Sequence, residues 1–258
     1  MNNMKHHTTA NTGNMKNSQY FEALVEFIGT TPVPPEKIRL TQRKVKELAA
    51  NATDNPRDNV RENYEILYHT QEAILDVVEA RYGKCDEDID TYMHPVLRDA
   101  ENNKHTGSVI WSLKDQPRTF GIGVGSFAES WEQVFYELCH ETVHLLNPVL
   151  DIKQFRVSAL EEGVAVKFAE ETYEIFIAIY TCNGPLVTPT SNKSSSYFKA
   201  FSIAKKIPDN ILKLIRKEFG KFSAVDNASL LMQIAPACIT AHEAQQMCDA
   251  FDYSFCQF

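Results

Sequence analysis

The residues of this chain with the clearest chemical potential are the five of His140-Glu141-Thr142-Val143-His144. On an α-helix, residues four positions apart lie on one face, so both imidazoles can bind the same zinc ion. Glu141 lies about 100° further round the helix, near the open coordination position of such an ion. Zinc lowers the pKa of a bound water towards about 7, and the glutamate can then accept its proton and pass it on. The alternative is a chance match, which composition predicts in roughly one chain in a hundred of this length.

A zinc site of this kind needs a third protein ligand, and residues 160–165 read Leu-Glu-Glu-Gly-Val-Ala. Seventeen residues separate His144 from Glu162, which is enough for a turn and a returning helix. This pattern resembles the gluzincin metallopeptidases, in particular the aminopeptidase and leukotriene-hydrolase group. In that group H-E-x-x-H is followed after a very similar interval by N-E-G-F-A, whose glutamate is the third zinc ligand. The resemblance gives this role to Glu162, and it makes Glu161, at the family's asparagine position, the alternative ligand.

The resemblance continues at residues 197–204, where Tyr-Phe-Lys-Ala-Phe-Ser-Ile-Ala is similar to the family's Y-E-K-G-F-A-L-L segment. In the family, the tyrosine hydroxyl of this segment donates to the oxyanion of the tetrahedral intermediate. The resemblance therefore implies that Tyr197 stabilises developing negative charge. The alternative is a buried or rim tyrosine at the start of a helix. His242 is the alternative donor, although a lone histidine in an amphipathic helix is more often structural.

One feature of the family is missing. The aminopeptidases carry a G-x-M-E-N segment on an edge strand, and its glutamate binds the free amine of the substrate. The corresponding strand, Thr119–Gly125, has no acidic residue, although it could still pair with an extended peptide. The resemblance thus implies a zinc metallopeptidase that hydrolyses a peptide or protein substrate. The alternative is a catalytically inactive or regulatory zincin-fold module, which the unmatched N-terminal helices favour and the intact Glu141 opposes.

Particular elements must bring these residues together. The segments Ser108–Leu113 and Thr119–Val124 are rich in β-formers and predict a hairpin. Ser126–Glu129 is a capping-box sequence, so the first metal-binding helix should begin directly after the second strand and end at Pro148. Ser158–Tyr180 predicts the second metal-binding helix. The expected fold is α+β and predominantly helical, a zincin-like catalytic domain with a small β-sheet and two metal-binding helices.

The remaining chain is organised around this core. Residues 1–18 are polar and are expected to form a mobile tail, and residues 19–107 predict an N-terminal helical block. Residues 108–258 hold the catalytic core and the C-terminal helices, so 19–258 is interpreted as one domain. The polar stretch Thr181–Ser196 is interpreted either as a lid over the cleft or as a plain connection.

Composition excludes several other classes of protein. The 258 residues include 26 Lys and Arg against 34 Asp and Glu, a net charge of −8, which disfavours a nucleic-acid binder. The longest apolar run, Ile175–Tyr180, is far too short to cross a membrane, and the N-terminus has no secretory signal. The six cysteines form no C-x-x-C pair and are expected to be reduced thiols, with Cys139 as a small core residue. These features favour a cytoplasmic protein, and nothing in them specifies an oligomeric state.

Overall fold

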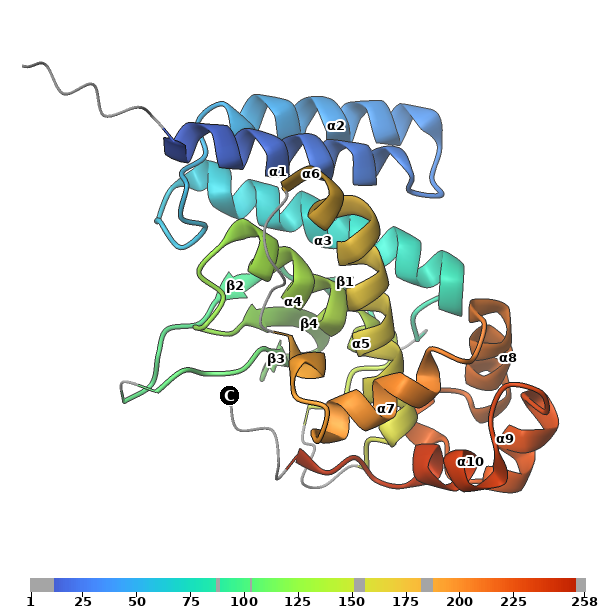
Figure 1. The fold of residues 1–258 in the computed structure, drawn as a ribbon. Helices are drawn as coiled ribbons and strands as arrows, with labels where there is room; N and C mark the ends of the chain where they lie inside the picture. Colours follow the sequence, from blue (N-terminus) through green and yellow to red (C-terminus); the bar gives the residue numbers. More distant parts are fainter. Residues whose placement is uncertain (1–11, 87–88, 103, 151–155, 182–187, 254–258) are drawn as a thin grey trace, which may run out of the picture.

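The computed structural model describes residues 12–86, 89–102, 104–150, 156–181 and 188–253. The described chain is predominantly helical with one small sheet (Figure 1), which confirms the α+β class predicted from the sequence. Buried apolar side chains from Tyr20 to Phe251 form a single contiguous cluster. The segments before and after residue 108 therefore share one hydrophobic core. No helix in the described part of the chain is both long and apolar enough to cross a membrane.

Three helices form the N-terminal block: α1 (Thr12–Gly29), α2 (Pro35–Ala49) and α3 (Arg61–Tyr82). Figure 1 shows α1 and α2 side by side, with α3 on the side of them that faces the rest of the molecule. Residues 12–18 were predicted to belong to a mobile tail, but they form the first turns of α1; residues 1–11 lie outside the described residues.

Aromatic side chains join this block to the middle of the molecule. Tyr20 and Phe21 of α1 contact Trp131, with ring centroids 5.7 and 5.4 Å apart. Phe27 contacts Phe135 edge to face at 5.3 Å. Because edge-to-face and stacked aromatic pairs stabilise beyond the area they bury, this cluster fixes α1 against the helix that begins at Trp131.

The sheet consists of β1 (Thr91–Tyr92), β2 (Val96–Leu97), β3 (Val109–Leu113) and β4 (Gln116–Val124). β3 and β4 form the predicted antiparallel hairpin. β1 and β2 are parallel to β4 and follow one another along its other edge. The interpretation of Thr119–Gly125 as an edge strand open to a peptide is therefore wrong, because β4 is paired on both sides. Within the described chain, β3 pairs only with β4 and is the edge strand on that side.

Two central helices follow, α4 (Trp131–His144) and α5 (Ala159–Tyr173). The predicted cap of α4 at Ser126 is wrong: Ser130 caps the helix by accepting from the Gln133 amide. Ser126 instead accepts from the Thr106 amide at 2.8 Å, which fixes the loop between β4 and α4. α4 also ends at His144 rather than at Pro148.

The second helix begins as predicted, with the Ser158 side chain accepting from the Glu161 amide as its N-cap. Its last part is not regular α-helix. α5 continues into a π-helical segment, η1 (Glu174–Ala178), and a short α6 (Ile179–Thr181), which together contact α1. The stretch interpreted as a lid or connection lies partly outside the described residues, at 182–187.

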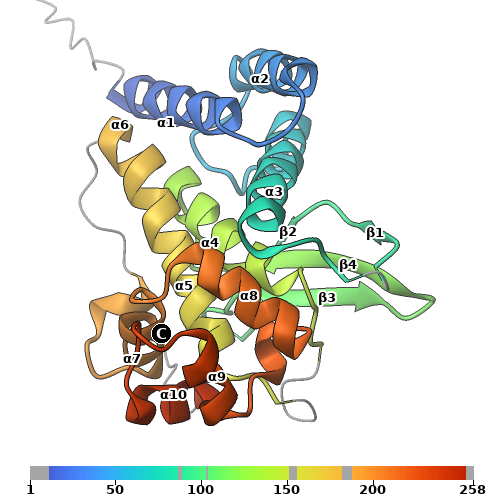
Figure 2. The same cartoon turned by 90° about the vertical axis from the view of Figure 1, so that its right-hand side faces the viewer.

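The C-terminal part comprises η2 (Pro189–Ser191), α7 (Ser196–Ala204), α8 (Asp209–Phe219), η3 (Phe222–Ala224), α9 (Ala228–Ile234) and α10 (Ala241–Cys248). Figure 2 shows α9 and α10 at the end of α5 that lies away from α1 and α2, and α8 packs against α3 and α9. α7 packs along α5 so closely that a Cβ atom on Gly163 would lie 2.7 Å from the Ala200 carbonyl oxygen. Among the described cysteines, Cys85, Cys139, Cys238 and Cys248 are free thiols, and Cys139 is fully buried.

Candidate metal centre

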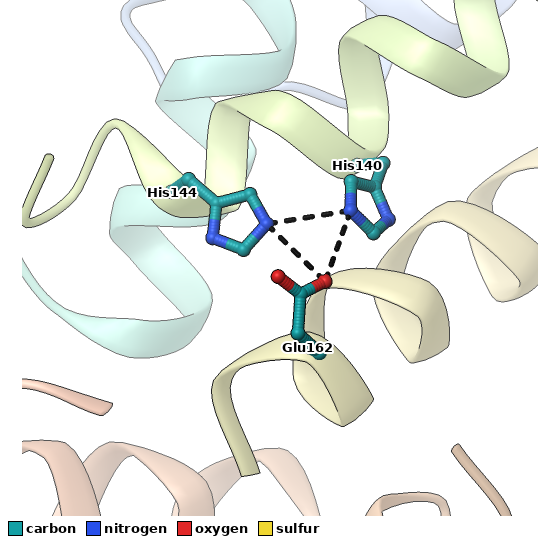
Figure 3. A group of neighbouring side chains, drawn as sticks. All are labelled: His140, His144 and Glu162. Carbon is teal, nitrogen blue, oxygen red and sulfur yellow. Dashed lines mark hydrogen bonds and ion pairs between the residues drawn. The ribbon is translucent and has the colours of Figure 1, made fainter. Parts of the chain in front are cut away.

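Two helices bring three metal-ligating side chains to one point. His140 and His144 come from the last turns of α4, and Glu162 comes from the first turn of α5. The two Nε2 atoms are 3.3 Å apart, and Glu162 Oε2 lies 3.4 Å from His140 Nε2 and 3.7 Å from His144 Nε2. Figure 3 shows the three side chains pointing toward one another. His140 and Glu162 are buried and His144 is partly buried. Their three ligand atoms could hold one metal ion.

Within the described part of the chain, the polar partners of the atoms that would face an ion are one another. Glu162 Oε2 is buried without a hydrogen-bond partner among the described residues, apart from its approach to the two imidazoles. A buried carboxylate oxygen in this state is costly unless a cation satisfies it. The donor set therefore fits a metal ion better than it fits a purely structural cluster.

Glu161, the alternative ligand, occupies a different position. Its Oε1 atom lies 2.9 Å from His144 Nδ1, on the side of the ring away from the other two ligands. A carboxylate at this nitrogen fixes the tautomer and orientation of a metal-binding imidazole and leaves its Nε2 lone pair for the ion. The neighbouring acidic residues thus have different placements, with Glu162 at the centre and Glu161 behind His144.

Without a metal, the three ligands stabilise one another as charges. Burial opposes ionisation of both histidines, but the adjacent carboxylate of Glu162 outweighs it and raises the pKa of His140 and, more strongly, that of His144. Burial likewise disfavours ionised Glu162, yet the two imidazoles lower the pKa of its carboxyl well below the usual range. The metal-free centre is therefore an ion cluster in which a cation would replace protons.

Glu141 and Tyr197 lie beside this group. Both line a cavity of about 180 Å³ together with the three ligands, and the Tyr197 ring centroid is 6.1 Å from that of His140. Burial raises the pKa of Glu141, an effect that the nearby imidazoles partly offset. The other proposed donor, His242, is exposed on α10 and is not among the residues that line this cavity.

A tyrosine near the end of the described chain completes the centre. The Tyr253 hydroxyl donates to Glu162 Oε1 at 2.7 Å, and Tyr253 lines the same cavity. Burial and the nearby carboxylates raise the pKa of Tyr253, so its phenol stays protonated. Sequence reasoning missed this residue, and no local pattern signals it, because its partner is 91 positions away.

A further buried carboxylate lies about one helical turn before Glu141 on α4. Glu137 accepts from the Ser108 hydroxyl at 2.7 Å and from the Gln133 amide at 3.0 Å. It lines a smaller cavity of about 80 Å³ that shares Ser108, His140, Glu141 and Tyr197 with the larger one. Burial raises the pKa of Glu137 to about 6. Its position four residues before Glu141 on the same helix is a signal that could have identified it.

The edge strand lines the same region. Ser108, Val109 and Ile110, from the start of β3 and the residue before it, form one wall of the larger cavity.

Comparison of the chain with protein-family models, with curated proteins and with solved structures finds no match.

Proposed function

We propose that this chain is a zinc-dependent metallopeptidase of the gluzincin type, with a zincin-like fold, that hydrolyses peptide bonds. In this proposal His140, His144 and Glu162 hold the zinc ion, Glu141 is the general base, and Tyr197 is the oxyanion donor. The observation that carries it is the convergence of three ligand atoms, from two buried residues and the partly buried His144, beside a buried glutamate in one cavity.

Ligand spacing supports zinc as the metal. Two ligands at about 2.1 Å from an ion, separated by a tetrahedral angle, lie about 3.4 Å apart. The three separations in this centre are 3.3, 3.4 and 3.7 Å. Two histidines and one glutamate are also a donor set of catalytic zinc sites that keep a coordination position open. A zinc ion there would lower the pKa of a water ligand and polarise a carbonyl group.

The remaining chemistry falls to the chain's own residues. Glu141 accepts a proton from the attacking water and returns it to the leaving amine, and its raised pKa brings it closer to the working pH of such a shuttle. The Tyr197 hydroxyl donates a hydrogen bond to the oxygen on which charge develops. The edge of β3 that no strand of the described residues pairs with lies beside the cavity and binds the substrate backbone by strand addition.

Metal content and peptide cleavage test separate parts of this proposal. Purified wild-type protein should contain about one zinc per chain by elemental analysis, and His144→Ala should contain far less. No zinc in the wild type, or equal zinc in both proteins, contradicts the centre. In a peptide-library screen, Glu141→Gln should retain zinc and lose nearly all cleavage. Equal cleavage by wild type and Glu141→Gln removes the proposed base.

The size of the cavity favours one alternative, a zincin-fold binding module without turnover. Ligand pockets generally have volumes of roughly 300–1,000 Å³, whereas this cavity has about 180 Å³. Such a module would bind zinc in the same assay and cleave no member of the library. Cleavage that depends on Glu141 excludes it.

A further inference from the structure

The segment after α10 runs directly over the first turn of α5. The Ala159 amide donates to the Asp249 carbonyl at 2.9 Å, and the Phe251 amide donates to the Val157 carbonyl at 2.8 Å. Ser158 and Ala250 form an antiparallel bridge between these two bonds. The segment 249–253, called here the C-terminal strap, is thus paired to the chain that leads into the helical turn carrying Glu162.

Aromatic packing holds the strap from its other side. The buried Phe251 ring lies 4.8 Å from the ring of Tyr197 and 4.8 Å from the ring of Tyr253. Backbone pairing on one side and this aromatic row on the other leave the Tyr253 side chain little freedom. Its hydroxyl is therefore held where it contacts Glu162, rather than reaching it as a mobile surface group.

The two oxygens of Glu162 face different partners. Oε1 accepts the hydrogen bond of the Tyr253 hydroxyl at 2.7 Å, whereas Oε2 faces the two imidazoles. A hydrogen bond of this length to a charged acceptor is at the strong end of the range for O–H donors. Oε1 would have to give up this bond before it could turn toward a metal.

We propose that Tyr253 is a positioning residue of the metal centre, which keeps Glu162 a ligand through Oε2 alone. The inference depends on the proposed metal site and goes beyond it, because it adds a residue outside the motif and assigns it an effect on coordination. A carboxylate that binds through one oxygen, with two histidines and a water, leaves a four-coordinate ion that can take substrate as a fifth ligand, whereas binding through both oxygens fills that fifth position. The C-terminal strap is then part of the centre.

The test compares Tyr253→Phe with Tyr197→Phe. Both changes remove one hydroxyl from the same cavity and the same aromatic row, and the hydrogen bond to Glu162 that the described residues show comes from Tyr253. Zinc affinity is measured by competition with a chromophoric chelator, and the coordination number by the visible absorption of the Co²⁺-loaded proteins. Melting of the metal-free proteins by circular dichroism checks that each variant is folded.

Tyr253→Phe should bind zinc about 10- to 100-fold more weakly than wild type, the usual effect of removing a group that orients a metal ligand. Its Co²⁺ absorption should weaken, as expected when a four-coordinate site gains a fifth ligand atom. Tyr197→Phe should stay within about twofold of wild type in affinity, with an unchanged spectrum. Equal affinity in Tyr253→Phe and wild type, or an equal loss in both variants, overturns the inference. In either case zinc binding by the wild type shows that the proposed centre itself stands.

Discussion

Glu137 provides a test of whether the interior beside the candidate metal centre excludes water as fully as its burial indicates. This carboxylate is 7 % exposed, and burial is the main cause that raises its pKa from 4.5 to about 6. Hydrogen bonds from Ser108 and Gln133 and the charge of His140 oppose the rise without cancelling it. The folded chain therefore holds this proton more tightly than the unfolded chain does.

The size and sign of the effect follow from proton linkage. Between pH 4.5 and about 6 the folded state binds more protons than the unfolded state, so the free energy of unfolding falls as the pH rises through this window. At about 1.36 kcal/mol for each pH unit, ionised Glu137 costs the fold about 2 kcal/mol above pH 7 and almost nothing at pH 4. Glu137→Gln removes this cost. It also loses hydrogen bonds that an amide cannot make, but that loss does not depend on pH.

The assay is urea unfolding of the metal-free protein at pH 4 and pH 8, in the presence of a chelator. The stability of Glu137→Gln relative to wild type should be about 2 kcal/mol more favourable at pH 8 than at pH 4. The hydrogen bonds that an amide cannot reproduce affect both pH values equally and cancel in this comparison. Glu218→Gln, at an exposed position on α8, is the control. Its stability relative to wild type should differ between pH 4 and pH 8 by less than about 0.5 kcal/mol. A relative stability of Glu137→Gln that is equal at both pH values, or lower at pH 8, would refute the reasoning.

Two further substitutions test the packing and the orientation of the centre. Gly163→Ala usually stabilises a helix, but here the added Cβ would meet the Ala200 carbonyl at 2.7 Å, so α7 must move. We expect the free energy of unfolding, measured with urea, to fall by about 1–3 kcal/mol. An unchanged or higher value would show that α7 can shift away from the added methyl group without cost. Glu161→Gln retains an acceptor for His144 Nδ1 but loses its charge, so zinc should bind about tenfold more weakly in chelator competition. Wild-type zinc affinity in this variant would mean that the charge of the Glu161 carboxylate does not strengthen zinc binding by His144.

Local sequence determined the parts of the centre that lie within one helix. The i, i+4 spacing of His140 and His144 fixes both imidazoles on one face as soon as α4 forms. The helical pattern that follows from Ser158 likewise predicts where α5 begins, and in the structure the Ser158 side chain caps that helix. The hairpin of β3 and β4 was predictable for the same reason, since its strands and turn are contiguous in the chain.

Other assignments from sequence failed because neighbouring elements compete for the same groups. Ser126 has the spacing of a cap, yet the loop at Thr106 uses its hydroxyl, and Ser130 caps α4 instead. The family resemblance placed Thr119–Gly125 as an edge strand, but β1 and β2 cover the side that the hairpin leaves free. Neither competitor is close enough in sequence to leave a local signal.

Tertiary structure decided how the centre is completed. Glu161 and Glu162 are adjacent and chemically equivalent, so only the angle at which α5 meets α4 places Glu162 between the imidazoles and Glu161 behind His144. Tyr253 reaches Glu162 only because the C-terminal strap returns across the start of α5. The sequence by itself determined a pair of histidines on one helix face and the types of their partners. Which partner atoms meet these histidines depends on long-range packing, because the partner side chains come from segments far away in the sequence.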